Sequence, residues 1–305
     1  MKWLNMLKVS FILLSYNQSK YIADAVNAAL AQSYPNIEFI FSDDCSTDDT
    51  FEQISSISKF SKKNIILNKN NINLGLSAHF NLLLRMATGD IIVVAAGDDV
   101  SLPERVERTV EYFELYPEIT FLSFNDELID ENSNMVGFHN LVVKEQLFTL
   151  NDFISGSVEG LSAASRGFRR GVYEHFGALN EDCPTEDTPY ILRNLMLGKG
   201  LLSPFAGIKY RVHSASLSDK ENLRKMDHNK IDYQYRCDAN IALNNNVICR
   251  ETYDNLIHWC EYFTSIKNIS SQGNYFLKVI RYMKLLLCNK YFRRSFLLKL
   301  GVAFK

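Results

Sequence analysis

Short apolar runs and helix-like patterns alternate along the first half of the chain. The runs 9–14 (VSFILL) and 37–41 (IEFIF) have the length and composition of buried strands. Between them, apolar side chains recur at the three- and four-residue spacing of one helix face: Ile22, Ala25, Val26, Ala29 and Leu30. The alternation continues with strands at 65–67, 91–95 and 119–124 and helices after 46, at 77–87 and at 104–115. This pattern predicts a Rossmann-like α/β fold, with a mostly parallel central sheet flanked by helices.

Polar clusters follow three of these predicted strands. They are Ser15-Tyr16-Asn17, Asp43-Asp44 with Ser46, and Asp98-Asp99. Each cluster alone also fits a turn or a helix cap, where Asp, Asn and Ser are common. However, ligands of open α/β sheets bind where the carboxyl ends of the strands converge, so we expect the three clusters to form one site. Crowded carboxylates repel each other unless a cation lies between them, and oxygen ligands shared with phosphate are typical of magnesium and manganese. The pattern therefore predicts a nucleoside diphosphate held through a divalent metal.

Composition and missing motifs exclude several other classes of protein. The 305 residues are 47% hydrophobic with a formal net charge of -2, which gives no reason to expect nucleic acid as a partner. Neither G-x-x-x-x-G-K-[ST] nor G-x-G-x-x-G occurs, so an ATPase or a dehydrogenase is not supported. Six scattered cysteines without a C-x-x-C pair favour a reducing, cytoplasmic compartment. We expect no signal peptide and no membrane-spanning helix, because no cleavage signal and no run of eighteen apolar residues occur.

Several motifs occur in the order typical of one enzyme family. The segments 9–50, 73–81 (NLGLSAHFN) and 87–99 (ATGDIIVVAAGDD) resemble the nucleotide-sugar half of family 2 glycosyltransferases of the GT-A fold. The resemblance covers about residues 8–215 and implies a nucleotide-diphosphate sugar donor, in particular a UDP-sugar. It also implies Mn2+ or Mg2+ as the cofactor.

The resemblance assigns roles to the three clusters. Ser15, Tyr16 and Asn17 would lie against the nucleobase, with the Tyr16 ring packed on it, and Asp44 would hydrogen-bond the uracil. Asp98 would contact the ribose, and Asp98 and Asp99 would hold the metal on the diphosphate. The family's common form is D-x-D-D, but Ala96 replaces the first acid here. Which of the two remaining acids is the metal ligand therefore stays open.

The segment 183–200 (CPTEDTPYILRNLMLGKG) supplies a candidate catalytic base. It resembles the family's T-E-D segment, which implies that Asp187 takes the proton from the attacking hydroxyl and that Glu186 is its neighbour. Acids before an apolar helical pattern are also an ordinary helix start, where the helix dipole favours them. One base and one metal suffice for a single displacement, which inverts the anomeric centre.

The segment 210–218 (YRVHSASLS) completes the predicted site. A lone histidine is more often structural than a ligand. Here His213 follows the T-E-D segment and resembles the family histidine that completes the metal shell. Arg211 could contact phosphate through its forked donors.

After residue 218 the sequence becomes charged and helical in pattern. We expect a GT-A domain at 1–218 and a helical C-terminal region at 219–305. The tail 274–305 has eight Lys or Arg residues and no Asp or Glu, interleaved with apolar side chains. This pattern is typical of a helix that lies on an anionic membrane, and we expect peripheral contact at the inner face of the cytoplasmic membrane. The alternative is a helix that packs its apolar face on the catalytic domain.

These observations favour an inverting glycosyltransferase that acts on a saccharide or lipid-linked acceptor in bacterial surface-polysaccharide biosynthesis, such as lipopolysaccharide or O-antigen. The alternative is a noncatalytic sugar-nucleotide or glycan-binding module on the same fold, which the loss of the first acid at Ala96 would support. A nucleotidyltransferase is disfavoured, because residues 13–20 lack a glycine- and arginine-rich loop for a triphosphate.

Overall fold

The computed structural model describes residues 6–139, 141–155, 164–213, 216, 220–271 and 275–288. Its central feature is one ten-stranded sheet with the path β3-β2-β1-β4-β9-β6-β10-β5; β7 pairs with β6, and β8 pairs with β10. The strands are β1 (Val9–Ser15), β2 (Ile37–Asp43), β3 (Asn64–Lys69), β4 (Ile91–Ala96), β5 (Val100–Ser101), β6 (Ile119–Ile129), β7 (Met135–His139), β8 (Gln146–Phe148), β9 (Gly167–Arg169) and β10 (Lys199–Arg211).

The sheet is mostly parallel, as the alternation of apolar runs and helices predicts. Strands β1, β2, β3 and β4 pair in parallel, and so do β6 and β10. The short strand β9 lies between β4 and β6 and is antiparallel to both. The carboxyl ends of β1, β2 and β4 therefore meet at one edge, where the three polar clusters stand.

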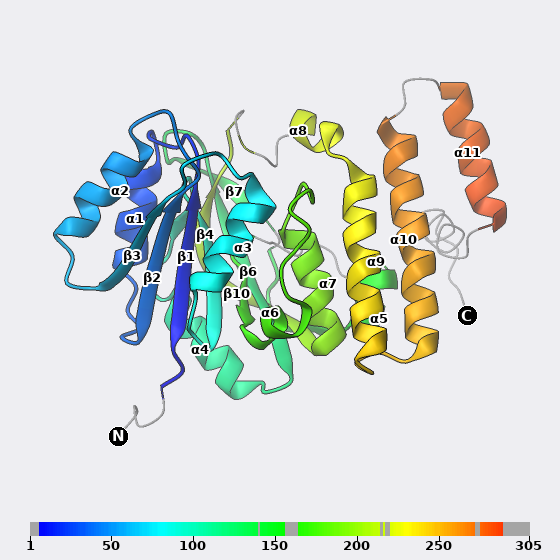
Figure 1. Cartoon of the computed structure of the whole chain (residues 1–305), viewed down its shortest axis with the longest axis horizontal. Helices are drawn as coiled ribbons and strands as arrows, with labels where there is room; N and C mark the ends of the chain where they lie inside the picture. Colours follow the sequence, from blue (N-terminus) through cyan, green and yellow to red (C-terminus); the bar gives the residue numbers. More distant parts are fainter. Residues whose placement is uncertain are drawn as a thin grey trace.

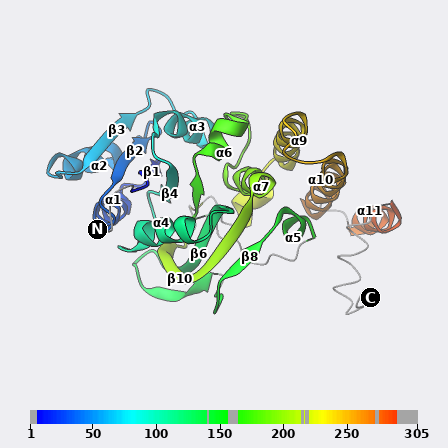
Figure 2. The same ribbon diagram turned by 90° about the horizontal axis from the view of Figure 1, so that it is seen from below.

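Helices cover both faces of this sheet (Figure 1, Figure 2). They are α1 (Ile22–Leu30), α2 (Thr50–Lys59), α3 (Leu76–Met86), α4 (Arg105–Leu115), α5 (Leu150–Ser155), α6 (Gly171–Phe176), α7 (Asp187–Leu197), α8 (Lys220–Lys225), α9 (His228–Asn244), α10 (Arg250–Ser271) and α11 (Tyr275–Cys288). Alternate residues of β1 divide between two hydrophobic cores. Val9, Phe11 and Leu13 pack with α1 and α4, while Ile12 and Leu14 pack with α3 and α7. This period of two is the signature of a strand buried on both faces.

The C-terminal helices continue the second core. Buried residues of α9 and α10, among them Tyr235, Ala239 and Trp259, belong to the same cluster as α7 and the sheet. Figures 1 and 2 both show α9, α10 and α11 side by side beyond α7. The guanidinium of Arg193 on α7 pairs with Asp238 on α9 at 2.8 Å, and both side chains are fully buried. The apolar and ionic contacts fix α9 on α7.

Two predicted helices begin differently from the sequence pattern. The helix expected after Ser46 and Thr47 begins at Thr50, where the Asp48 carboxylate accepts a hydrogen bond from the Thr50 backbone N–H at 3.1 Å. The charged region after residue 218 divides into α8 and α9, because the Asp227 side chain accepts from the Asn229 N–H and starts a new helix.

Among the helices that the structure describes, none combines the length and the apolarity needed to cross a bilayer. Part of the basic tail, residues 289–305 and 274, lies outside the described residues.

Candidate functional site

The pairing of β5 with β10 assembles the core of the site. Val100 and Ser101 of β5 pair with Lys209 and Ile208 of β10, so the Asp98-Asp99 turn lies against the end of β10. Arg211 and His213 follow at once along the chain. The two motifs, more than a hundred residues apart in sequence, therefore meet at the carboxyl edge of the sheet.

A glycine is required immediately before the two acids. A Cβ at Gly97 would lie 2.8 Å from Cδ1 of Ile22 and 3.0 Å from Cβ of Ser15, and closer still to Oε1 of Gln18. The backbone that leads from β4 to Asp98 therefore passes directly against α1 and the end of β1. This close approach fixes where the first acid emerges.

Asp98 and His213 form the part of the cluster that could hold a metal. Oδ2 of Asp98 lies 3.1 Å from Nε2 of His213, and their side chains keep 15% and 13% exposure. The carboxylate fits Mn2+ or Mg2+, and the imidazole fits Mn2+ rather than Mg2+; such ions complete their shell with phosphate oxygens and water. Within the described residues, no group of three acidic, histidine or cysteine side chains gathers to form a complete metal site.

Asp99 faces the interior instead. Its Oδ1 accepts a hydrogen bond from the backbone N–H of Arg211 at 2.9 Å, and the residue is 5% exposed. Burial, together with the neighbouring charge of Asp98, raises the pKa of Asp99 well above its usual range. Asp99 thus ties the acidic turn to β10.

The Arg211 guanidinium is also directed inward. Its Nε donates to the carbonyl of Asp98 at 2.9 Å, and one terminal nitrogen donates to the carbonyl of Asp130 at 3.1 Å and to Oγ of Ser133 at 2.9 Å. The other terminal nitrogen lies 3.5 Å from the Asp24 carboxylate. Arg211 is 1% exposed; its Nε and one terminal nitrogen donate within the chain, whereas the other terminal nitrogen makes no hydrogen bond to the described residues.

The loops after β1 and β2 are bound to each other. The backbone N–H of Asn17 donates to Oγ of Ser46 at 2.8 Å, and Oδ1 of Asn17 accepts from the N–H of Thr47 at 2.9 Å. Asn17 adopts a φ of 51°, a left-handed conformation that asparagine tolerates. Oγ of Ser15 donates to the carbonyl of Ser42 at 3.0 Å. Ser15 and Asn17 therefore shape the loop, and Tyr16 between them is 46% exposed.

Asp44 organises a third loop. Its Oδ1 accepts from Nδ2 of Asn70 at 2.7 Å and from the N–H of Leu74 at 2.9 Å, and its Oδ2 accepts from the N–H of Gly75 at 3.0 Å. Asp44 is 4% exposed, and Gly75 begins the turn into α3 with a φ of 80°. The adjacent Asp43 accepts from the N–H of Ser46 at 2.9 Å. The acids at the end of β2 thus hold the loop after β2 and the loop that leads into α3.

The T-E-D segment forms the N-terminus of α7, as predicted. Glu186 is the residue before the helix, and Asp187 is its first residue. Oδ1 of Asp187 accepts from the N–H of Thr188 at 2.5 Å and from the hydroxyl of Thr185. Asp187 remains partly exposed at the helix N-terminus.

Glu186 is paired and buried. Its carboxylate forms an ion pair with Arg166, and both side chains are at most 10% exposed. Burial raises the pKa of Glu186, the charge of Arg166 opposes the rise, and the charge of Asp187 adds to it. The carbonyl of Arg166 accepts from the N–H of Val94 at 3.3 Å. Arg166 therefore connects the T-E-D segment to β4, the strand that leads to Asp98.

Sequence reasoning missed three supporting residues. Arg166 stands in a segment without a recognisable motif, and its partner Glu186 follows twenty residues later. The Tyr21 ring packs at a tilt against His213, with ring centroids 5.1 Å apart, and the Arg211 guanidinium lies 4.5 Å from the centroid of the Tyr21 ring. Arg105 is 1% exposed and donates to the carbonyls of Val94 and Arg166 at 2.6 and 3.2 Å. A single sequence does not indicate that a basic residue, or a tyrosine at the start of a helix, supports a functional site.

Comparison with solved structures identifies the fold. TarS 1–349 of Staphylococcus aureus in complex with UDP-GlcNAc superimposes with a TM-score of 0.68 at 16% identity, over 98% of this chain and 93% of that chain. The mannosyltransferase PcManGT of Pyrobaculum calidifontis, in complex with GDP-Man and Mn2+, superimposes with a TM-score of 0.60 at 16% identity. The superposition covers 98% of this chain and 80% of that chain. The fold, with acids gathered at the carboxyl edge of its sheet, is that of GT-A glycosyltransferases.

The family follows from the sequence of the same domain. The model of glycosyl transferase family 2 matches residues 10–177, and the chain belongs to this family. A Haemophilus influenzae protein described as an uncharacterized glycosyltransferase is 27% identical over 80% of each chain. The Escherichia coli protein WfaP, a UDP-Glc:alpha-D-GlcNAc-diphosphoundecaprenol beta-1,3-glucosyltransferase, is 33% identical over 42% of this chain and 49% of its own length.

Proposed function

We propose that the protein is an inverting glycosyltransferase that transfers a sugar from a UDP-sugar to a hydroxyl of a saccharide or lipid-linked acceptor in cell-surface polysaccharide biosynthesis. The observation that carries the proposal is the contact between Asp98 and His213 at the edge of the sheet. WfaP is described as acting with a UDP-sugar donor on a diphosphoundecaprenol-linked acceptor, which supports the donor and acceptor classes. ExoO, a succinoglycan biosynthesis protein of Rhizobium meliloti that is 25% identical, supports the polysaccharide context.

Asp98 and His213 are the residues that would hold Mn2+ or Mg2+, and Asp99 would position Asp98 from behind. When bound, the metal would neutralise charge on the leaving diphosphate. The geometry supports metal binding by Asp98 and positioning by Asp99, because Asp98 is partly exposed while Asp99 is buried against the Arg211 backbone. Arg211 would act as a positioning residue, since its Nε and one terminal nitrogen donate to the Asp98 and Asp130 carbonyls.

Tyr16 and Asp44 would recognise the nucleobase. The Tyr16 ring is exposed at the end of β1 and offers a face for stacking. Asp44 accepts one hydrogen bond at Oδ2 from the described residues, and a carboxylate oxygen has room for a second donor such as a uracil N–H. Ser15 and Asn17 would hold Tyr16 in place through their contacts with the β2 loop.

Asp187 would act as the general base. Both hydrogen bonds that it receives from the described residues go to Oδ1, so Oδ2 is left for the acceptor hydroxyl. The carboxylate takes the hydroxyl proton while the oxygen attacks the anomeric carbon and the bond to the diphosphate breaks. This single displacement inverts the anomeric centre. Glu186, paired with Arg166, would position Asp187 rather than take the proton.

A thermal-shift panel tests the donor site. The full-length protein is heated with UDP, GDP, dTDP or CMP, each with Mn2+, with Mg2+ or with chelator. We expect UDP with metal to raise the Tm, because a ligand that binds only the folded state stabilises it by mass action. Absence of any shift would instead favour a noncatalytic module on the same fold.

We also propose peripheral contact with the cytoplasmic membrane through the basic tail. In α11, Val279, Ile280, Met283 and Leu287 are 41–73% exposed and recur at helical spacing. Lys284 is exposed on the same helix. Apolar and basic side chains together fit an anionic lipid surface. Flotation with phosphatidylglycerol vesicles tests this contact, and a protein shortened to residue 271 that floats equally well would rule out the tail as the anchor.

A further inference from the structure

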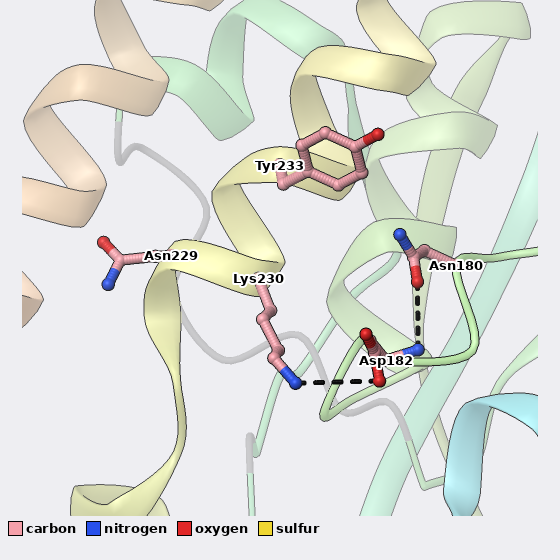
Figure 3. Close-up of a pocket in the computed structure, with 5 residues that line it drawn as sticks. All are labelled: Asn180, Asp182, Asn229, Lys230 and Tyr233. Atoms are coloured by element: carbon pink, nitrogen blue, oxygen red, sulfur yellow. Dashed lines mark hydrogen bonds and ion pairs between the residues drawn. The ribbon is translucent and has the colours of Figure 1, made fainter.

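A cavity lies on the side of α7 that faces the C-terminal helices. It has a volume of about 310 Å³ and opens between the loop that leads into α7 and the first turns of α9. Asn180, Asp182, Asn229, Lys230 and Tyr233 line it (Figure 3). None of these residues belongs to the donor site described above.

The residues that line the cavity all carry polar groups, and the one ion pair among them is long. Nζ of Lys230 lies 3.7 Å from Oδ1 of Asp182, and their side chains are 48% and 78% exposed. An ion pair this long and this exposed contributes little stability, so both charges remain able to bind a ligand. Oδ1 of Asn180 accepts from the N–H of Asp182 at 3.0 Å. The Tyr233 ring, 57% exposed, stands above this group (Figure 3).

We infer that this cavity binds a saccharide unit of the acceptor, at a distance from the unit that carries the attacking hydroxyl. Each sugar hydroxyl both donates and accepts, so neighbouring hydroxyls match an ammonium beside a carboxylate. The C–H face of a sugar ring carries partial positive charge and packs on the negative face of an aromatic ring such as Tyr233. The volume is at the lower end for ligand pockets, which fits one sugar unit better than a complete nucleotide sugar.

The cavity is rigidly connected to the candidate base. Asp182 and Asp187 are five residues apart, a separation that spans at most about 18 Å of chain. The loop between them is fixed, because Oγ of Ser77 donates to the carbonyl of Cys183 at 2.6 Å. The N–H of Asn180 donates to Oε1 of Gln234 on α9 at 2.7 Å. A saccharide in the cavity can therefore extend toward Asp187, so this inference rests on the proposed glycosyl transfer.

Saturation-transfer NMR on the full-length protein tests the inference without nucleotide. The probes are glucose, galactose, mannose, N-acetylglucosamine, cellobiose, lactose and chitobiose. We expect at least one to receive saturation from the wild type. Tyr233→Ala should weaken that signal at least tenfold, whereas Tyr233→Phe should retain it because the ring remains. Asn244→Ala, an exposed change at the far end of α9, is the matched control and should bind like the wild type.

Two results would overturn the inference: no probe binds the wild type, or binding survives Tyr233→Ala unchanged. The UDP thermal shift separates this failure from that of the proposed function. Tyr233→Ala should keep the wild-type shift, because the donor site does not include Tyr233. Saccharide binding that requires Tyr233 in a protein without a UDP shift would leave the cavity as a glycan site and refute the transfer.

Discussion

Asp98 and Asp99 are adjacent residues with different surroundings. Asp98 is partly open beside His213, whereas Asp99 is buried on the backbone of Arg211. Asp98→Asn should lower metal-dependent turnover by on the order of a hundredfold or more, because it removes the charge that would bind the metal. Asp99→Asn keeps an oxygen that can accept from the Arg211 N–H, so this substitution should lower turnover less than tenfold. Turnover measured against Mn2+ concentration checks both, and equal losses would contradict the division of roles.

Asp187 and Glu186 allow a similar comparison. Asp187→Asn should leave the UDP-dependent Tm shift intact while turnover falls on the order of a hundredfold or more, as expected for loss of a general base. Glu181→Gln, an exposed change in the same loop, is the control and should retain wild-type turnover. If Asp187→Asn abolishes donor binding without a separate effect on turnover, Asp187 is not the base.

At the scale of elements, Glu38 joins three parts of the sheet. Its carboxylate accepts from Oγ of Ser10 on β1 at 2.5 Å and from the N–H of Thr88 before β4 at 2.6 Å, and it pairs with Lys8. Burial opposes its ionisation, but the hydrogen bonds from Lys8, Ser10 and Thr88 outweigh burial and lower the pKa from 4.5 to about 2.

The depressed pKa predicts a pH dependence of stability. The ionised Glu38 carboxylate contributes fully to the stability of the folded protein above pH 4.5, and this contribution is lost as the pH falls toward about 2. Glu38→Gln should therefore lower the Tm by several degrees at pH 7, and the difference from wild type should shrink below pH 4.5. Glu52→Gln removes an exposed ion pair with Lys69 and should change the Tm little. A Glu38→Gln difference that is constant from pH 7 to pH 2 would contradict this account.

The longer elements could be predicted from hydrophobic periodicity, and the shortest could not. The expected helix face at Ile22, Ala25, Val26 and Ala29 is buried in α1, and the run 91–95 lies within β4. By contrast, β5 has two residues and β9 three, too few to show any period. Their pairing depends on neighbours more than forty residues away, which no local pattern encodes.

At the scale of the whole molecule, the buried pair of Arg193 and Asp238 joins the catalytic half to the C-terminal helices. Arg193→Met should lower the free energy of unfolding by about 3–5 kcal/mol, because it leaves a buried carboxylate unpaired. The double variant with Asp238→Leu should recover much of that loss. Urea unfolding followed by circular dichroism is the measurement, and a double variant no more stable than the single one would contradict the explanation.

Residues of the candidate site could be predicted from the sequence only where they belong to a recognisable motif. Resemblance to family 2 led to Asp98, His213 and Asp187, and the structure brings Asp98 and His213 into contact. The inward direction of Arg211 could not be predicted, because it depends on Asp24, Asp130 and Ser133 from separate loops. The same holds for the pair of Arg166 and Glu186, since long-range packing decides which acid is paired and which is open.

The position of β9 also affects how this protein is made. Strands β4 and β6 are complete once residue 129 has been synthesised, yet the strand that separates them is Gly167–Arg169. A chain growing on the ribosome therefore carries an unpaired edge of β4 and one of β6 until β9 emerges, and the other edge of β6 waits for β10. Such edges are templates for pairing with other chains. We therefore expect the nascent protein to be most exposed to aggregation during a defined interval of translation, which ends when β10, the parallel partner of β6, has been synthesised.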